Sequence, residues 1–278
     1  LAYNFALPPL TLHTLRTGNA SALRDWAATL ALPSRDVTFF NFLASHDGIG
    51  LNPARGILPQ ADIDALVQRT LDHGGLISSK HNADGTQSPY EMNINYFDAL
   101  SDPAGSEPIE RQAARFMAAQ AIMLMIVGMP GIYFHSLFGS RGWPAGVGET
   151  GRNRTINREK LSYERLTREL AEAGSLRNHV YSAYAALLRA RSSTPAFHPL
   201  GGQEVVDAGK HVFALWRTSP DGKARVLALQ NVTASPRSCA LADLGLPGSA
   251  HELITGVAVP AGSITLEPYQ TLWLLPAP

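Results

Sequence analysis

The chain has 278 residues, long enough for one large domain and a smaller second one. Its 45% hydrophobic and 17% charged residues are typical of a globular core, and 23 basic residues balance 23 acidic ones, which argues against nucleic acid or a membrane surface as a partner. One cysteine, Cys239, excludes an internal disulfide, and no basic leader is visible, so we expect a cytoplasmic protein.

The first elements alternate between strand and helix. Residues 2–6 are predicted to form a strand closed by Pro8 and Pro9, followed by a helix in two pieces at 10–15 and 22–30. The apolar, β-favouring run 37–44 predicts a buried strand.

This second strand ends in Ser45, His46, Asp47 and Gly48, where Asp-Gly indicates a turn. A barrel of parallel strands builds its site at the C-terminal ends of those strands, so His46 and Asp47 are candidate site residues. The alternative is that Asp47 only caps the turn and His46 only bonds a buried carbonyl.

Residues 48–95 form a long excursion. It contains one predicted helix, 61–73, with Ile63, Leu66, Val67 and Leu71 on one face, while the rest is expected to be turns. Irregular stretches of this length are usually lids or binding loops.

A long apolar stretch, 116–134, resembles a membrane span in length, but Gly128, Pro130 and Gly131 divide it. We therefore predict a buried helix that begins near Ser106 and runs to about residue 127, followed by a strand at 131–134. A loop over 135–157 and a helix over 175–191 complete the alternation, which is typical of a parallel sheet.

The pattern changes at residues 193–195. Short predicted strands at 211–217, 225–231, 252–255 and 264–275 follow, separated by turn residues. We therefore expect a first domain over 1–195 and a small antiparallel β domain over 196–278.

Four segments together resemble glycoside hydrolase family 13: FLASHDGIG at 42–50, PYEMNINYF at 89–97, GIY at 131–133, and Gly151 with INR at 156–158. Within that family they resemble the sucrose phosphorylase branch and its glucosylglycerate phosphorylase-like relatives. The resemblance implies the C-terminal part of a (β/α)8 TIM barrel, about strands 6–8, with a lid-like insertion at about 48–95 and then an antiparallel all-β domain.

The resemblance also implies what the chain contributes. The family's nucleophilic aspartate follows the fourth strand and its acid/base glutamate the fifth, so both would belong to a missing N-terminal half, and the chain alone is expected to be inactive. Asp47 would stabilise the transition state, and His46, Arg158, Tyr90 and Glu91 would bind substrate. An ionised carboxylate near a sugar ring accepts hydrogen bonds that strengthen as an oxocarbenium-like transition state develops.

The implied activity is that of a retaining phosphorylase, which exchanges glucosyl between an α-glucoside and phosphate to give α-glucose 1-phosphate. Phosphate is a co-substrate, and no cofactor or metal is expected. The expected partners are a small sugar substrate and the missing half of the barrel. A second copy of the chain, in a homodimer, is a further possible partner. Sucrose phosphorylases typically have Gln at the position of Glu91, so sucrose, glucosylglycerate and similar donors all stay open.

Three alternatives remain. A zinc hydrolase would need three protein ligands, and His46 and Asp47 are only two. Hydrolysis or transglucosylation by the same superfamily is the second, and a sugar-binding remnant without catalysis is the third.

Overall fold

The computed structural model describes residues 1–32, 34 and 36–277. A three-stranded parallel sheet in the order β1-β2-β6 lies within the first part of the chain. Its strands are β1 (Ala2–Tyr3), β2 (Phe39–Asn41) and β6 (Met129–Pro130), and β2 pairs in parallel with both neighbours. Helices separate these strands in the sequence, as parallel pairing requires. The predicted βα alternation is confirmed.

All three strands are shorter than predicted. Pro8 and Pro9 do not close the first strand; they lie in the first turn of α1 (Leu7–Thr17), where a missing backbone N–H leaves no helical hydrogen bond unmade. The strand predicted at 131–134 is also wrong, because β6 ends at Pro130 and the chain enters α6 (Phe134–Leu137).

Two helices fill the connection between β1 and β2, namely α1 and α2 (Ser21–Ala28), close to the two predicted pieces. The short buried helix α4 (Tyr96–Leu100) and the long α5 (Ile109–Met125) precede β6. The helix predicted from near Ser106 to about residue 127 is confirmed as α5, although its N-cap residue is Pro108 and it ends at Met125. No helix in the described part of the chain combines the length and apolar character needed to span a bilayer.

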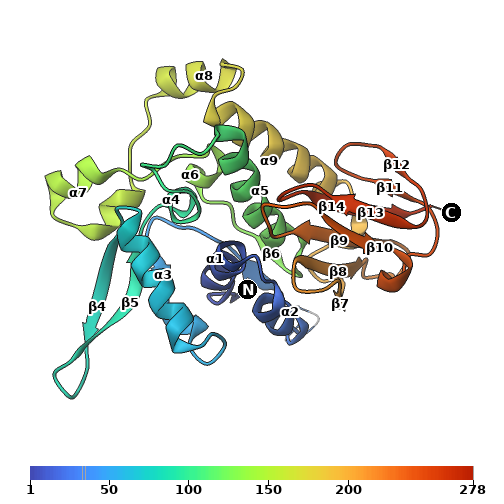
Figure 1. Cartoon of the computed structure of the whole chain (residues 1–278), viewed down its shortest axis with the longest axis horizontal. Coiled ribbons are helices and arrows are strands. Elements are labelled where there is room, and N and C mark those ends of the chain that lie inside the picture. The colour runs from blue at the N-terminus through green and yellow to red at the C-terminus, as the bar shows by residue number, and fades with distance from the viewer. Residues whose placement is uncertain (33, 35, 278) are drawn as a thin grey trace.

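The insertion at 48–95 contains more regular structure than predicted. Its helix α3 (Gln60–Asp72) is confirmed, although Leu71 is 48% exposed and does not belong to the buried face. The rest is a three-stranded antiparallel sheet in the order β3-β5-β4, with a short 3-10 turn, η1 (Asn52–Ala54), after its first strand. Figure 1 shows the β4–β5 hairpin projecting from the body beside α3; the three strands are β3 (Ile49–Gly50), β4 (Leu76–His81) and β5 (Gln87–Asn93).

The segment after α6 also holds elements that the sequence pattern does not predict. They are the helix α7 (Pro144–Thr150), the 3-10 helix η2 (Asn153–Asn157) and the exposed helix α8 (Tyr163–Ala171). The predicted helix at 175–191 is confirmed as α9 (Leu176–Ser192), which packs along α5.

The last third of the chain is an antiparallel β structure, as predicted. A six-stranded sheet has the order β12-β11-β14-β9-β8-β7, and a two-stranded ribbon, β10–β13, accompanies it. The strands are β7 (Gly202–Asp207), β8 (Val212–Thr218), β9 (Arg225–Asn231), β10 (Arg237–Ala240), β11 (Ala250–Glu252), β12 (Ala258–Val259), β13 (Ser263–Leu266) and β14 (Thr271–Pro276). A 3-10 turn, η3 (Pro195–Phe197), precedes β7, and another, η4 (Ala242–Leu244), lies between β10 and β11.

The two parts share one hydrophobic core. Buried residues of the β sheet, among them Phe213, Leu215 and Trp273, belong to the same cluster as the helices of the first part. At this junction the ring of Phe197 lies 4.5 Å from that of Trp273 between centroids. The β sheet therefore packs directly against the barrel portion and is not joined to it only by a linker.

Candidate active site

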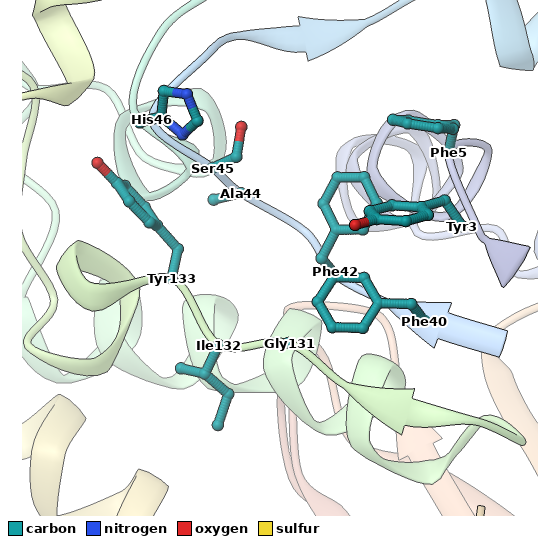
Figure 2. Close-up of a pocket in the computed structure, with 10 residues that line it drawn as sticks. All are labelled: Tyr3, Phe5, Phe40, Phe42, Ala44, Ser45, His46, Gly131, Ile132 and Tyr133. Atoms are coloured by element: carbon teal, nitrogen blue, oxygen red, sulfur yellow. The ribbon is translucent and has the colours of Figure 1, made fainter. Parts of the chain in front are cut away.

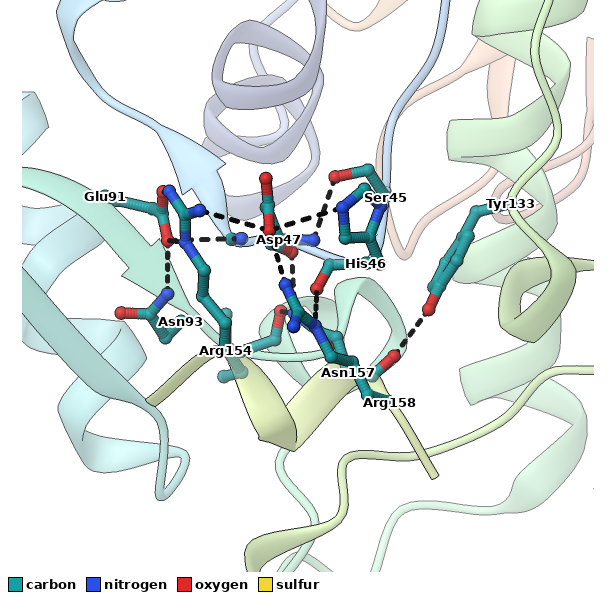
Figure 3. Close-up of polar contacts among 11 residues, drawn as sticks. Ser45, His46, Asp47, Glu91, Asn93, Tyr133, Arg154, Asn157 and Arg158 are labelled. Atoms are coloured by element: carbon teal, nitrogen blue, oxygen red, sulfur yellow. Dashed lines mark hydrogen bonds and ion pairs between the residues drawn. The ribbon is translucent and has the colours of Figure 1, made fainter. Parts of the chain in front are cut away.

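Asp47 lies just beyond the C-terminal end of β2, and its backbone is held on both sides. The backbone N–H of Asp47 donates to the hydroxyl of Ser45 at 3.1 Å, and the side-chain amide of Asn157 donates to the Asp47 carbonyl at 2.8 Å (Figure 3). Both contacts leave the carboxylate free of the backbone, and the Asp47 side chain is 33% exposed. The turn thus presents a carboxylate at the edge where β/α barrels place their chemistry.

Two arginines from one short segment meet this carboxylate. Nη2 of Arg158 lies 2.8 Å and Nη1 of Arg154 lies 3.3 Å from Oδ1 of Asp47. Arg158 also donates from Nε to the carbonyl of His46 at 2.9 Å, which fixes its guanidinium plane. Arg154 and Arg158 are four residues apart, across the 3-10 helix η2, so both reach the same target (Figure 3).

Glu91 is buried and forms the other anchor of Arg154. The guanidinium of Arg154 donates to both carboxylate oxygens of Glu91, at 3.0 Å from Nε and 2.6 Å from Nη2. Glu91 also accepts from the backbone of Gly48 and the side-chain amide of Asn93. The hydrogen bond to Glu91 is the main cause that raises the pKa of Arg154. Arg154 therefore bridges the carboxylates of Glu91 and Asp47.

Gly48 is required by this packing. A Cβ atom there would lie 2.4 Å from the carbonyl of Met92 and 2.7 Å from the Cγ of Glu91. The close approach lets the β5 strand, which carries Glu91, pass directly behind the Asp47 turn.

His46 and Tyr133 face an open cavity of about 310 Å³ (Figure 2). The His46 side chain is 67% exposed, and its Nε2 lies 3.6 Å from Oδ1 of Asp47. Tyr133 donates its hydroxyl hydrogen to the carbonyl of Asn157, and burial is the first cause that raises its pKa. These polar groups form one end of the cavity.

Aromatic rings on β1 and β2 and just beyond the ends of these strands form the other end of the cavity. The rings of Tyr3 and Phe40 have centroids 5.1 Å apart, and those of Phe5 and Phe42 are 5.4 Å apart. Tyr3 and Phe5 remain 60% and 56% exposed, a large apolar surface.

The structure thus brings three predicted site residues, His46, Asp47 and Arg158, into one cluster. Glu91 reaches the cluster through Arg154, and Tyr90 is half-buried beside it, with its backbone carbonyl bonded to Leu51. Sequence reasoning missed Arg154, although the four-residue spacing to Arg158 in a basic run could have indicated it. Within the described residues, no group of three or more His, Cys, Asp or Glu side chains is placed to hold a metal ion.

Comparisons with known proteins point to sugar phosphorylases. The chain is 48% identical to a glucosylglycerate phosphorylase of Spirochaeta thermophila and 42% identical to one of Escherichia coli, in each case over 99% of this chain. It covers 49% and 48% of those proteins, so it spans about half the length of the curated relatives that it matches. The crystal structure of sucrose 6F-phosphate phosphorylase from Thermoanaerobacter thermosaccharolyticum superimposes with a TM-score of 0.67 at 21% identity, over 83% of this chain and 43% of that one. No family model matches.

Proposed function

The chain belongs to the glucosylglycerate and sucrose phosphorylase branch of glycoside hydrolase family 13, and on this premise we propose that it supplies one face of the active site of a retaining α-glucoside phosphorylase. The reaction moves a glucosyl group between an α-glucoside and inorganic phosphate and yields α-glucose 1-phosphate. The observation that carries the proposal is the Asp47 carboxylate, held at the C-terminal end of β2 by two arginines.

Asp47 acts on the transition state in this proposal. Glycoside cleavage spreads positive charge over the ring oxygen and anomeric carbon, which makes the sugar hydroxyls better donors. A carboxylate fixed in advance accepts bonds that strengthen at that moment, so it lowers the barrier more than it tightens ground-state binding. Arg158 and Arg154 fix the carboxylate, and His46 offers a neighbouring donor to the same sugar.

The nucleophile and the acid/base group come from barrel strands outside this chain. Two features support this: β1 and β6 each have one open edge in the described sheet, and the relatives are about twice as long. The aromatic cavity on β1 and β2 is then the inner face of a closed barrel, which explains why Tyr3 and Phe5 are exposed here.

We expect the isolated 278-residue chain to release no glucose 1-phosphate from any α-glucoside. Removal of a catalytic nucleophile alone typically lowers the rate by several orders of magnitude. The measurement is glucose 1-phosphate formation by the purified chain in phosphate buffer, with the complete enzyme as positive control. Turnover by the chain alone, in a preparation free of other phosphorylases, would mean that it holds a complete catalytic set.

Glucosylglycerate is the donor that we propose. Two relatives with that printed name are 48% and 42% identical, whereas a sucrose phosphorylase of Bifidobacterium adolescentis is 29% identical over 70% of the chain. The charge of Glu91 is also matched by Arg154, so the carboxylate of glycerate would not face an unpaired negative side chain. The test is kcat/KM for phosphorolysis of glucosylglycerate and of sucrose by the complete enzyme. A preference for sucrose would contradict the proposed donor but not the phosphorylase.

Glu91→Gln should weaken catalysis by loosening Arg154. The amide keeps the size of Glu91 but breaks the bidentate, charge-assisted pair, which contributes about 1.5–3 kcal/mol in a buried setting. We expect kcat/KM to fall by about tenfold or more. Part of this fall should come from a higher KM for glucosylglycerate, which carries a carboxylate. Glu204→Gln is the matched control, because the exposed Glu204 pairs with the exposed Arg225, away from the Asp47 site. Equal kcat/KM values for Glu91→Gln and Glu204→Gln would show that Glu91 does not support catalysis.

A further inference from the structure

A second cavity, of about 220 Å³, lies among the helices that surround the barrel portion. Three arginines from three helices line it: Arg16 at the end of α1, Arg69 on α3 and Arg115 on α5. Helix α1 packs against both other helices, and Tyr269, in the turn before β14, contributes the wall on the side of the β sheet. None of the lining residues belongs to the Asp47 site.

The three guanidiniums are unequally satisfied. Arg115 is well paired: it bonds Glu107, the hydroxyl of Tyr269 at 3.1 Å and the carbonyl of Leu100 at 3.0 Å. Arg69, in contrast, donates only to backbone carbonyls, those of Ala99 and Leu100 at 3.1 and 2.9 Å. Among the described residues no carboxylate lies within ion-pair distance of Arg69.

Arg16 has an unpaired donor at the same place. Its Nη2 bonds the carboxylate of Asp62 at 3.0 Å, but its Nε is buried with no hydrogen-bond partner. A buried donor left unmade costs free energy, and native proteins normally satisfy such groups with protein, water or a ligand. Burial, and then the charges of Arg115 and Arg16, lower the pKa of Arg69. The cavity therefore holds more positive charge than its walls neutralise.

Tyr269 completes the wall in an unusual conformation. Its φ is 59°, and it is the one non-glycine residue with a positive φ in the described part of the chain. This conformation holds its ring 5.3 Å from the guanidinium carbon of Arg115, so the third arginine is kept in place by the β sheet.

We propose that this cavity binds a small tetrahedral oxyanion: inorganic phosphate or the phosphate group of a sugar phosphate. The buried Nε of Arg16 and the guanidinium of Arg69 would donate to it, and planar guanidinium forks match the oxygens of phosphate better than an ammonium does. The cavity is several times larger than the roughly 30 Å³ that a water occupies, which gives room for the ion. The site is separate from any phosphate bound at Asp47 during catalysis.

The test is isothermal titration calorimetry of the 278-residue chain with inorganic phosphate at constant ionic strength. We expect saturable binding, weakened by about tenfold or more in Arg69→Gln. Because Arg69 also bonds two carbonyls, Arg16→Gln is the second variant, and it should weaken binding similarly without loss of the folded circular dichroism spectrum. Arg111→Gln, on the exposed face of α5, is the matched control and should bind like the wild type.

Two further titrations identify the location and the source of the ligand. Arg158→Gln alters the Asp47 site, so it should leave this binding unchanged; loss of binding in Arg158→Gln with none in Arg69→Gln and Arg16→Gln would overturn the proposal. Absence of any saturable binding at millimolar phosphate would also overturn it. Tighter binding of glucose 1-phosphate than of inorganic phosphate assigns the site to a sugar phosphate, and the reverse order assigns it to the free ion, provided that Arg69→Gln weakens both.

Discussion

Asp47→Asn in the complete enzyme should lower kcat by about 10²–10³, with a much smaller change in KM. The amide keeps the size and one acceptor of the carboxylate but removes its charge and adds two donors. A charge-assisted contact that matters mainly in the transition state is worth about 3–4 kcal/mol, as for a deleted oxyanion-hole donor. The two arginines that now bond Asp47 would also lose their anionic partner.

The measurement is kcat and KM for glucosyl transfer to phosphate, with Arg158→Lys alongside. Arg158→Lys should cost less, because a positive charge remains while the planar fork is lost. A near-normal kcat in Asp47→Asn would contradict the proposed role of Asp47 in the transition state. His46 and Asp47 would then only form the turn after the strand.

Arg217→Met should lower the free energy of unfolding by about 3 kcal/mol or more. Arg217 on β8 is fully buried and donates to three backbone carbonyls: Met125 of α5 at 3.0 Å, Gly202 at 3.0 Å and His198 at 2.9 Å. Burial, and then the charge of Arg191, lower its pKa to about 9, which still leaves it protonated near neutral pH. Methionine fills the space but leaves the three carbonyls unsatisfied, and each such group costs about 1–3 kcal/mol.

Urea or thermal unfolding of the chain measures this effect. Arg225→Met on the adjacent strand is the matched control, because Arg225 is exposed and its side-chain partners are the exposed Glu204 and the ring of Trp216, whose centroid lies 4.5 Å from its guanidinium carbon. Its effect should stay within about 1 kcal/mol. Similar stabilities for the two variants would show that Arg217 does not join the barrel portion to the β sheet.

Local patterns predicted the elements that bury one clear face. The run at 225–231 became β9 with the predicted bounds, and α3 and α9 lie within one or two residues of their predicted bounds, because apolar periodicity and turn residues define such segments. The β4–β5 hairpin was not predicted, because Ser78, Ser79 and Lys80 in β4 show no alternating apolar pattern. Strand β4, whose last three residues are exposed, forms by pairing with β5, which a polar sequence permits but does not indicate.

Part of the candidate site could be predicted from the sequence. His46 and Asp47 stand at a strand end that the pattern shows, and the family resemblance added Arg158, Tyr90 and Glu91. The role of Arg154 depends on a contact across 63 positions of the chain, to Glu91, which no local pattern encodes. The pairing of Glu91 with Arg154 likewise appeared only in the structure.

Phosphorus NMR of the complete enzyme with glucosylglycerate and inorganic phosphate distinguishes phosphorolysis from hydrolysis. We expect the signal of α-glucose 1-phosphate to grow at the expense of phosphate, and this turnover to be largely lost in Asp47→Asn. Release of free glucose with no phosphate consumed would contradict this expectation, because the enzyme would then be a hydrolase and not a phosphorylase.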